Sequence, residues 1–306
     1  GFKASISPTT SVAIVNVSAD GSCHVLCSTV DMGQASDTAM AQIAAEVLGM
    51  QAEQVAVVHP DTDVTPYDMA TLGSRSTYHM GHAVKRAAED ARDKLLAMAN
   101  ELGLPPETTP IPLLFVKKYG MQAGNVIGMG SYLPTYAPMD HTTGRSANVT
   151  PYWMVGAAGV EVEVDTETGD VKVTRLINVA DLGRPINPAV VDSQLSGAAI
   201  MQLGFTMTEK MHFSDGMVTN PSLADYKIPG MLDIPPVIEN EAVDANEQSG
   251  PFGAKGVGES GTFGVSPAIA NAIEDAVGVR ITSLPITAEV VYRALRAAQG
   301  RPLPEE

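Results

Sequence analysis

The stretch AAGVEVEVDTETGDVKVTRLINVADLGRPINPAVVDSQLSGAAIMQLG, residues 157–204, carries the pattern that decides the fold. Two runs of alternating apolar and polar residues flank Thr168-Gly169-Asp170. A turn of this kind between alternating runs is typical of a β-hairpin. A polar loop that contains glycine comes next, and an amphipathic helical pattern follows it. We therefore expect a hairpin, a loop and a helix, in that order.

The same order occurs earlier in the chain. Residues 11–49, SVAIVNVSADGSCHVLCSTVDMGQASDTAMAQIAAEVLG, again contain two strand patterns, a turn at Ala19-Asp20-Gly21, a polar loop and a helix over 36–49. This repetition predicts an α+β protein made of two related units, each a strand hairpin plus a helix. We assign residues 1–150 to the first unit and residues 151–306 to the second.

A long helix is expected between the two hairpins. An apolar rhythm of helical period runs over residues 75–102, and Gly103 with the prolines after it ends the pattern. Residues 105–152 hold many Pro, Gly, Thr and Tyr residues and show only weak periodicity. They are predicted to be a long irregular connection, which in a compact protein is usually functional or partly disordered.

Two further helices are expected near the C-terminus. Ser266 is predicted to cap a helix that runs to about Ala276, with Pro267 in its first turn, where a missing N–H costs nothing. Thr287 is predicted to cap a last helix to about Ala298.

Composition and charge exclude several classes of protein. The chain has 306 residues, 44% of them hydrophobic, and 19 Lys and Arg against 35 Asp and Glu, a formal net charge of −16. This balance argues against binding nucleic acid or an anionic membrane face, which needs clustered cations. No apolar run approaches the ~20 residues of a membrane span. The N-terminus lacks the pattern of a secretion signal, so we expect a cytoplasmic protein.

The two cysteines predict neither a disulfide nor a metal site. Cys23 and Cys27 lie in an apolar stretch that reads as a strand. Residues four apart in a strand share a face but lie ~13 Å apart, too far for one disulfide or one metal ion. An iron–sulfur cluster needs four such ligands, and no Cys/His set has the spacing of a zinc site. We expect two small buried residues.

The stretch GPFGAKGVGESGTFG, residues 250–264, contains a literal G-x-G-x-x-G at residues 256–261. A dinucleotide fingerprint needs a buried strand before the first glycine and a helix that begins within the motif. Neither is present here, because the preceding residues are polar and the next helix pattern begins near Ser266. The Walker pattern is also absent. The sequence therefore argues against a nucleotide-binding loop of either kind.

What remains is a loop with so few side chains that its backbone can approach another group closely. Glu259 projects from its middle, flanked by Gly258, with Lys255 nearby. Two interpretations stay open on the residues alone. Glu259 is either a solvated residue of a mobile surface loop or a carboxylate held in a pocket, where it can serve as a base.

Two other polar loops precede helix patterns and are also candidates for a binding site. Met32-Gly33-Gln34 and Gly73-Ser74-Arg75-Ser76 place backbone N–H groups at a helix N-terminus, where anionic ligands are favoured. Ser74 and Ser76 can equally be simple helix caps. Gln34 and Gln194, taken singly, read as surface amides. His79 and His82 follow the second loop, either as ordinary helix residues or at a pocket mouth.

Taken together, these segments resemble the molybdenum-binding subunit of the xanthine dehydrogenase/aldehyde oxidase family. The resemblance rests on five blocks in the family's order: DMGQASDTAMAQIAAEVLG (31–49), TLGSRSTYHMGHAV (71–84), DLGRPINPAVVDSQLSGAAIMQLG (181–204), NPSLADYKIPGMLDIPP (220–236) and GAKGVGESGTFGVSPAIANAI (253–273). It covers the C-terminal half of a usual molybdenum subunit. The chain is similar in this to the separate medium subunit of nicotinate dehydrogenase of anaerobic bacteria, so we expect either a fragment or a naturally split subunit.

The resemblance implies roles for single residues. Glu259 matches the family's active-site glutamate in its G-V-G-E motif. Ala35 replaces the second glycine of the family's G-Q-G loop, which makes a close backbone approach at this position less certain. No protein side chain ligates the metal in this family, so no metal ligand is assigned. The residues implied to contact the pterin are Gly33, Gln34, Gly73, Ser74, Ser76, Gln194, Gly256 and Gly258.

The resemblance further implies an activity, cofactors and partners. The activity is hydroxylation of an sp² carbon of an N-heterocycle or aldehyde, with water as the oxygen source. The cofactor is molybdenum–molybdopterin, expected in its cytosine dinucleotide form, while the 2Fe-2S and FAD groups lie on partner subunits. A further partner carries the N-terminal half of the molybdenum domain. The alternative is a non-catalytic assembly or scaffold subunit, although Glu259 and Gln34 would have no purpose in one.

Overall fold

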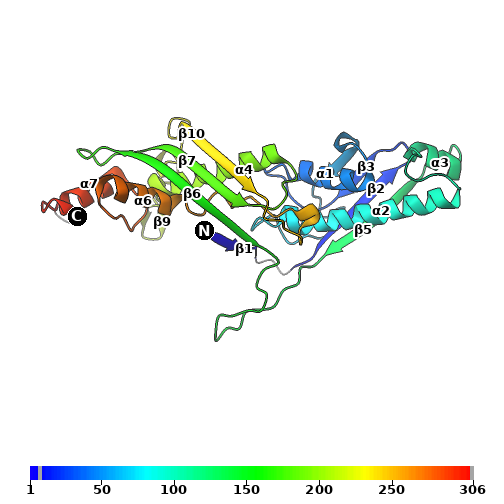
Figure 1. Cartoon of the computed structure of the whole chain (residues 1–306), viewed down its shortest axis with the longest axis horizontal. Helices are drawn as coiled ribbons and strands as arrows, with labels where there is room; N and C mark the ends of the chain where they lie inside the picture. The colour runs from blue at the N-terminus through cyan, green and yellow to red at the C-terminus, as the bar shows by residue number, and fades with distance from the viewer. Residues whose placement is uncertain (6–8, 304–306) are drawn as a thin grey trace.

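The computed structural model describes residues 1–5 and 9–303. The molecule is elongated, and it contains two four-stranded sheets, one in each half (Figure 1). Helices α1 and α2 accompany the first sheet, whereas α4, α6 and α7 accompany the second (Figure 1). The chain therefore has the α+β architecture that the repeated pattern predicts.

The first sheet has the strand order β4-β3-β2-β5. Strand β2 pairs antiparallel with β3 and with β5, and β3 runs parallel to β4. Its strands are β2 (Ser11–Ser18), β3 (Cys23–Leu26), β4 (Val55–Val58) and β5 (Asn125–Tyr132). Its helical elements are α1 (Ser36–Leu48), the 3₁₀ turn η1 (Ala52–Gln54), the π-helical turn η2 (Ser76–Met80), α2 (Gly81–Glu101) and α3 (Ile111–Tyr119).

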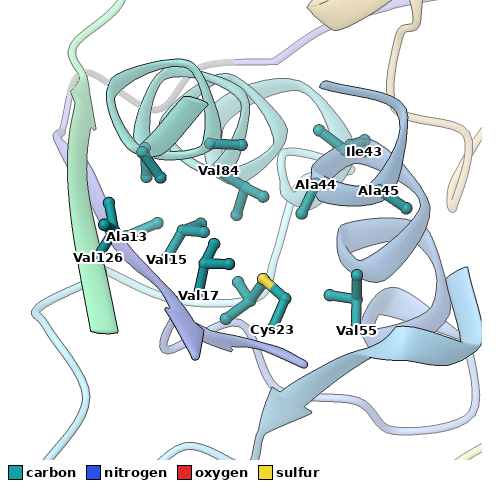
Figure 2. Packing of buried hydrophobic residues seen from close by; sticks show 14 of the residues in the cluster. Ala13, Val15, Val17, Cys23, Ile43, Ala44, Ala45, Val55, Val84 and Val126 are labelled. Carbon is teal, nitrogen blue, oxygen red and sulfur yellow. The ribbon is translucent and has the colours of Figure 1, made fainter. Parts of the chain in front are cut away.

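Alternation along β2 builds the core of this unit. Ala13, Val15 and Val17 are fully buried and lie on one face of the strand, as the period of two requires. Figure 2 shows these side chains directed toward α1 and α2, together with Cys23 of β3. Cys23 and Cys27 are free and buried, which confirms the prediction for the cysteines.

Helix α2 lies unusually close to β5. An alanine stripe of the helix, which includes Ala83, Ala87 and Ala91, is fully buried. A Cβ atom at Gly128 or Gly130 of β5 would lie 2.0 or 2.2 Å from the carbonyl oxygen of Ala87 or Ala83. Small residues on both elements therefore permit backbone contact between helix and strand.

The second sheet repeats the first, with the strand order β10-β7-β6-β1. The hairpin strands β6 and β7 are antiparallel, and β10 runs parallel to β7. Its strands are β1 (Phe2–Ala4), β6 (Trp153–Val164), β7 (Val171–Asp181) and β10 (Val237–Val243). The other elements are α4 (Pro188–Met207), β8 (Phe213–Ser214), β9 (Met217–Val218), α5 (Leu223–Tyr226), the 3₁₀ turn η3 (Pro251–Gly253), α6 (Val265–Val277) and α7 (Ala288–Ala298).

The expected order of hairpin, loop and helix is thus present in both units. Strand β1, from the start of the chain, pairs antiparallel with β6 and so completes the second sheet. In the first sheet the equivalent place beside β2 belongs to β5, which follows α2. The division at residue 150 stays a prediction, and β1, from the start of the chain, belongs to the sheet of the second unit.

Several expectations need correction. The long helix does not begin at residue 75, because the π-helical turn Ser76–Met80 precedes α2. Residues 105–152 are not irregular throughout, since they contain α3 and β5, and the glycines of β5 weaken its strand pattern. Ser266 does not cap α6, because Gly264 is the N-cap and the Ser266 hydroxyl bonds Gln202 and Thr206. Thr287 caps α7 as predicted, accepting a hydrogen bond from the backbone N–H of Val290.

Residues 133–149 leave the body of the molecule as an arm (Figure 1). The arm is held by bonds within itself, among them Ala137 N–H to Asn148 O at 2.7 Å. Across the described ranges 1–5 and 9–303, no helix has the length and apolar character to cross a membrane.

Candidate active site: a cavity between the two units

The polar loops of the two units meet around one cavity of about 640 Å³. Its wall comes from the loop before α1, the loop before η2, the connection between β7 and α4, one face of α4 and the glycine-rich loop after η3. Every residue predicted for the site lies in this wall: Glu259, Gly33, Gln34, Gly73, Ser74, Ser76, Gln194, Gly256 and Gly258. The fold therefore gathers segments that lie far apart in the sequence around one space.

The carboxylate of Glu259 is oriented by Ser74. The Ser74 hydroxyl donates to Oε2 of Glu259 at 2.8 Å and accepts from the backbone N–H of Glu259 at 3.0 Å. Lys3 of β1 forms an ion pair with the same oxygen. The Glu259 side chain is 43% exposed, so it is reachable from the cavity yet held by contacts from two separate elements.

The backbone of Ser74 is held closely as well. Its φ of 61° is left-handed, and its carbonyl oxygen accepts from the Tyr152 hydroxyl at 2.8 Å. Burial raises the pKa of Tyr152 to about 12, so the hydroxyl keeps its proton at neutral pH. A Cβ atom at Gly256 would lie 1.5 Å from the same carbonyl oxygen, whereas one at Gly258 would lie 3.6 Å from the Ser74 hydroxyl. Close approach therefore demands glycine at position 256 and not at position 258.

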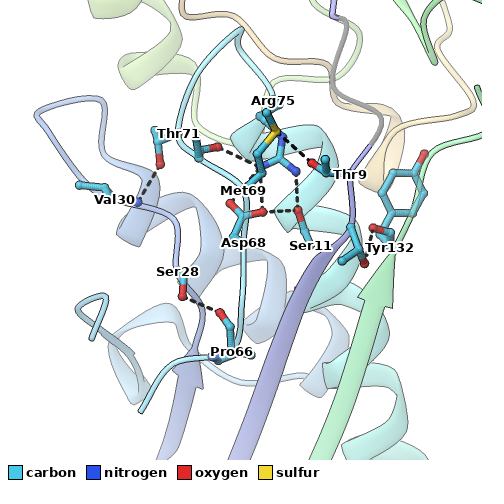
Figure 3. A network of polar contacts seen from close by, with 12 residues as sticks. Thr9, Ser11, Ser28, Val30, Pro66, Asp68, Met69, Thr71, Arg75 and Tyr132 are labelled. Carbon is cyan, nitrogen blue, oxygen red and sulfur yellow. Dashed lines mark hydrogen bonds and ion pairs between the residues drawn. The ribbon is translucent and has the colours of Figure 1, made fainter. Parts of the chain in front are cut away.

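A buried ion pair anchors the loop that carries Ser74 (Figure 3). The side chains of Arg75 and Asp68 are 1% and 2% exposed, and Nη1 of Arg75 donates to both carboxylate oxygens at 2.7 and 2.9 Å. Nη2 donates to the Ser11 hydroxyl at 2.8 Å, and that hydroxyl donates to Asp68 at 2.7 Å. Because Ser11 belongs to β2, this network fixes the loop to the first sheet.

A second cation anchors the glycine-rich loop. Lys255, whose side chain is 6% exposed, donates to Asp181 at 2.8 Å and lies 3.6 Å from Glu247. Burial alone would raise the pKa of Asp181, but hydrogen bonds from Lys255 and from the Gly183 N–H hold this pKa below its usual value. The pKa of Glu247 is also lowered, because bonds from Ser249 and the charge of Lys255 outweigh its burial. Lys255 thus ties the loop to the end of β7.

The loop before α1 is organised by its own side chains. The Gln34 amide donates to the carbonyl of Val30 at 2.7 Å and accepts from the Met32 N–H at 2.7 Å. Asp31 accepts from the Gly33 N–H at 2.9 Å. Ala35 adopts a left-handed φ of 56°, so the backbone keeps a conformation that favours glycine although the residue is alanine.

Two polar side chains in the wall are free to bind a ligand. Gln194 on α4 and Ser76 at the start of η2 are half-buried and line the cavity. Neither side chain makes a hydrogen bond to another residue in the part of the chain that the structure describes. The Gln194 amide and the Ser76 hydroxyl therefore have hydrogen-bonding capacity left for a polar ligand in the cavity.

The histidines do not line the cavity wall. His79 is fully buried, and His82 stacks on the ring of Tyr132 with ring centroids 4.3 Å apart. Burial lowers the pKa of His82, and its Nε2 lies 2.7 Å from the carbonyl oxygen of Ser249. Both residues fit the interpretation as ordinary helix histidines. Within residues 1–5 and 9–303, no group of three or more His, Cys, Asp or Glu side chains could hold a metal ion.

Sequence reasoning missed the residues that position the loops. Arg75 stands at the start of the apolar helical pattern over residues 75–102. A charged residue at a position of such a pattern indicates that it has a buried partner. Asp68 and Tyr152 lie in segments without periodicity, so nothing in the sequence pattern marks them. Lys3 contacts Glu259 only because β1 joins the second sheet, a pairing that no local signal predicts.

Comparison with known proteins agrees with this geometry. Residues 1–235 match the family described as molybdopterin cofactor-binding domain. The chain belongs to this family. It is the molybdopterin-binding domain found in the xanthine dehydrogenase/aldehyde oxidoreductase family, which confirms the resemblance seen in the sequence.

Individual members are similar along nearly the whole chain. A putative xanthine dehydrogenase molybdenum-binding subunit of Escherichia coli is 31% identical over 91% of this chain and 38% of its own length. Subunit gamma of the 6-hydroxypseudooxynicotine dehydrogenase complex of Paenarthrobacter nicotinovorans is 32% identical over 91% and 36%. The aldehyde oxidoreductase structure from Desulfovibrio gigas superposes with a TM-score of 0.83 at 28% identity, covering 97% of this chain and 32% of that one. The chain thus spans about a third of its relatives' length.

Proposed function

We propose that this chain is the segment of a molybdenum hydroxylase that binds molybdopterin and supplies the general base Glu259. The observation that carries the proposal is the cavity shared by Glu259, Ser76 and Gln194. The cofactor is proposed in its cytosine dinucleotide form. The proposed partners are the polypeptide with the rest of the molybdenum domain and the subunits with 2Fe-2S and FAD.

The residues present fit such a cofactor. Gly33 and Gly73 have left-handed φ values of 103° and 60°, and a Cβ at either would meet nothing within 4 Å. The wall is therefore bare there and offers backbone groups to a ligand. Gln194 and Ser76 offer side-chain hydrogen bonds to the ligand. Gln34 offers a hydrogen bond when it gives up its bonds to Val30 and Met32 within the loop.

The bound cofactor supplies two-electron redox chemistry for hydroxylating an sp² carbon with water as the oxygen source. Glu259 accepts the proton that this reaction releases. Its Oε2 already accepts from Ser74 and contacts Lys3, so the proton goes to Oε1. Ser74 and Lys3 hold the carboxylate in one orientation, which positioned proton transfer requires.

The groups that would take up the electrons are proposed to lie on partner chains. The two thiols of this chain, Cys23 and Cys27, are buried, and burial raises the pKa of each to about 11. They remain protonated and cannot supply the four thiolates of a cluster. The substrate is proposed to be an N-heterocycle or an aldehyde, in line with the names of the similar proteins, which are dehydrogenases of xanthine and 6-hydroxypseudooxynicotine and an aldehyde oxidoreductase.

Metal and pterin analysis tests the proposal. The complex is purified through a tag on this chain, its molybdenum is measured by mass spectrometry, and its pterin by fluorescence after oxidation. We expect about one molybdenum per chain, and oxidation of at least one of purines, nicotinate or aldehydes with an artificial electron acceptor. A complex without molybdenum and without pterin would instead indicate the non-catalytic scaffold.

A further inference from the structure

Residues 208–234 form a surface that is unusually apolar for an exposed segment. All of these residues are described, and none is buried. Met217 is 71% exposed, Met231 84% and Leu232 100%. Single apolar residues are ordinary on a protein surface, but a dense group of them is typical of a face that another surface covers. The other large exposed apolar residues of the segment include Met211, Phe213 and Leu223.

The segment has a defined shape without a core of its own. It contains the two-residue strands β8 and β9 and the single turn α5. Polar bonds attach it to the end of α4, since the Thr208 hydroxyl donates to the carbonyl of Lys227 at 2.7 Å. Pro229 lies against Gly204, where a Cβ atom would be 2.4 Å from the proline ring. The segment is therefore held in place while its apolar side chains face outward.

Helix α4 leads from the cavity wall to this apolar segment. Gln194, Met201 and Phe205 of α4 have a spacing that places them on one face of the helix. Gln194 and Met201 line the cavity, and Met201 and Phe205 are 72% and 52% exposed. We call Met201, Phe205 and the exposed apolar residues of 208–234 the α4 surface. It begins in the cavity wall and extends onto the segment that follows the helix.

The relatives indicate what covers this surface. The chain matches 38% of the Escherichia coli subunit and 32% of the Desulfovibrio gigas aldehyde oxidoreductase, so most of their length lies outside it. We infer that the α4 surface binds the polypeptide that carries the rest of the molybdenum-binding subunit, and that this polypeptide closes the cavity beside Met201. This inference rests on the proposed function, because it treats the chain as part of such a subunit. The net charge of −16 disfavours an anionic membrane as the occupant.

Site-specific crosslinking tests the inference in the complex purified through a tag on this chain. A photo-crosslinking amino acid replaces Met217 or Met231, and the matched control replaces Met121, which is 96% exposed but lies beyond α3 in the other unit. We expect crosslinks from positions 217 and 231 to a sequence similar to the part of the relatives that this chain does not match. Position 121 should give at least tenfold fewer of these crosslinks.

Other outcomes overturn the inference. Crosslinks from 217 and 231 to a second copy of this chain would assign the α4 surface to a homodimer, and crosslinks to lipid would assign it to a membrane. No crosslinks above the level at position 121 would leave the surface open to solvent. Molybdenum content is measured on the same sample. Molybdenum without the expected crosslinks refutes the inference alone, whereas the crosslinks without molybdenum refute the proposed function alone.

Discussion

The two loops that meet at Glu259 reach the cavity by different physical means. The loop with Ser74 is fixed by the Arg75–Asp68 pair, which is almost wholly withdrawn from solvent. The loop with Glu259 is fixed by Lys255 between carboxylates that are 20% and 18% exposed, and by a backbone approach that only glycine permits. The loop with Ser74 relies on a buried charge pair, whereas the glycine-rich loop relies on close contact of its backbone with the Ser74 carbonyl.

The largest expected effect tests the first loop. Asp68→Asn leaves the Arg75 guanidinium buried without a compensating charge. Breaking a buried ion pair from one side costs about 3–5 kcal/mol. We expect the free energy of unfolding, measured with urea, to fall by about 4 kcal/mol. A loss below 1 kcal/mol would mean that solvent reaches the pair and that the loop is not anchored in this way.

The second prediction tests the backbone contact. Gly256→Ala places a Cβ atom 1.5 Å from the carbonyl oxygen of Ser74, so one of the two loops must move. Overpacking of this kind lowers the free energy of unfolding by up to about 3 kcal/mol. Gly258→Ala is the matched control, because its Cβ would lie 3.6 Å from the nearest atom. Urea unfolding of the two variants should differ clearly, and equal behaviour would contradict the close approach.

The third prediction concerns the stability of the fold at acidic pH. Asp181 and Glu247 have pKa values below their ordinary values of 3.8 and 4.5, so the unfolded chain binds more protons as the pH falls. Their stabilisation is complete above these ordinary values and is lost as the pH drops through the lowered ones. Lys255→Met should lower the free energy of unfolding at pH 7 by about 2 kcal/mol. In this variant the free energy of unfolding should also fall less steeply between pH 5 and 3. An unchanged slope in that range would remove Lys255 as the partner.

The smallest expected effect on stability comes from Lys3. Its ion pair with Glu259 is partly exposed, with side chains 32% and 43% accessible. Pairs of this kind contribute about 0–1 kcal/mol. Lys3→Met should therefore leave the urea midpoint almost unchanged. A loss of stability as large as that of Asp68→Asn would show that Lys3 has a structural role.

The comparison also shows what the sequence can and cannot reveal. Alternation over residues 11–26 and 157–181, with the turns between the strands, predicts both hairpins, because local pattern decides them. The residues of the cavity wall are predicted by the resemblance to a known family. Residue spacing alone does not decide whether Glu259 is solvated or lies in a pocket. Arg75–Asp68 and Lys3–Glu259 were not predictable, since each pair is formed by the tertiary fold. Strand β5 was missed because its glycines serve the contact with α2.

One measurement tests the central claim, that Glu259 acts as the base of a molybdenum hydroxylase, most directly. Glu259→Gln is produced in the assembled complex, and turnover per bound molybdenum is compared with that of the unchanged protein. The amide keeps the shape of the side chain but cannot accept the proton, so we expect a decrease of about 10²–10⁴-fold with molybdenum retained. Near-normal turnover at equal molybdenum content would contradict the role of Glu259.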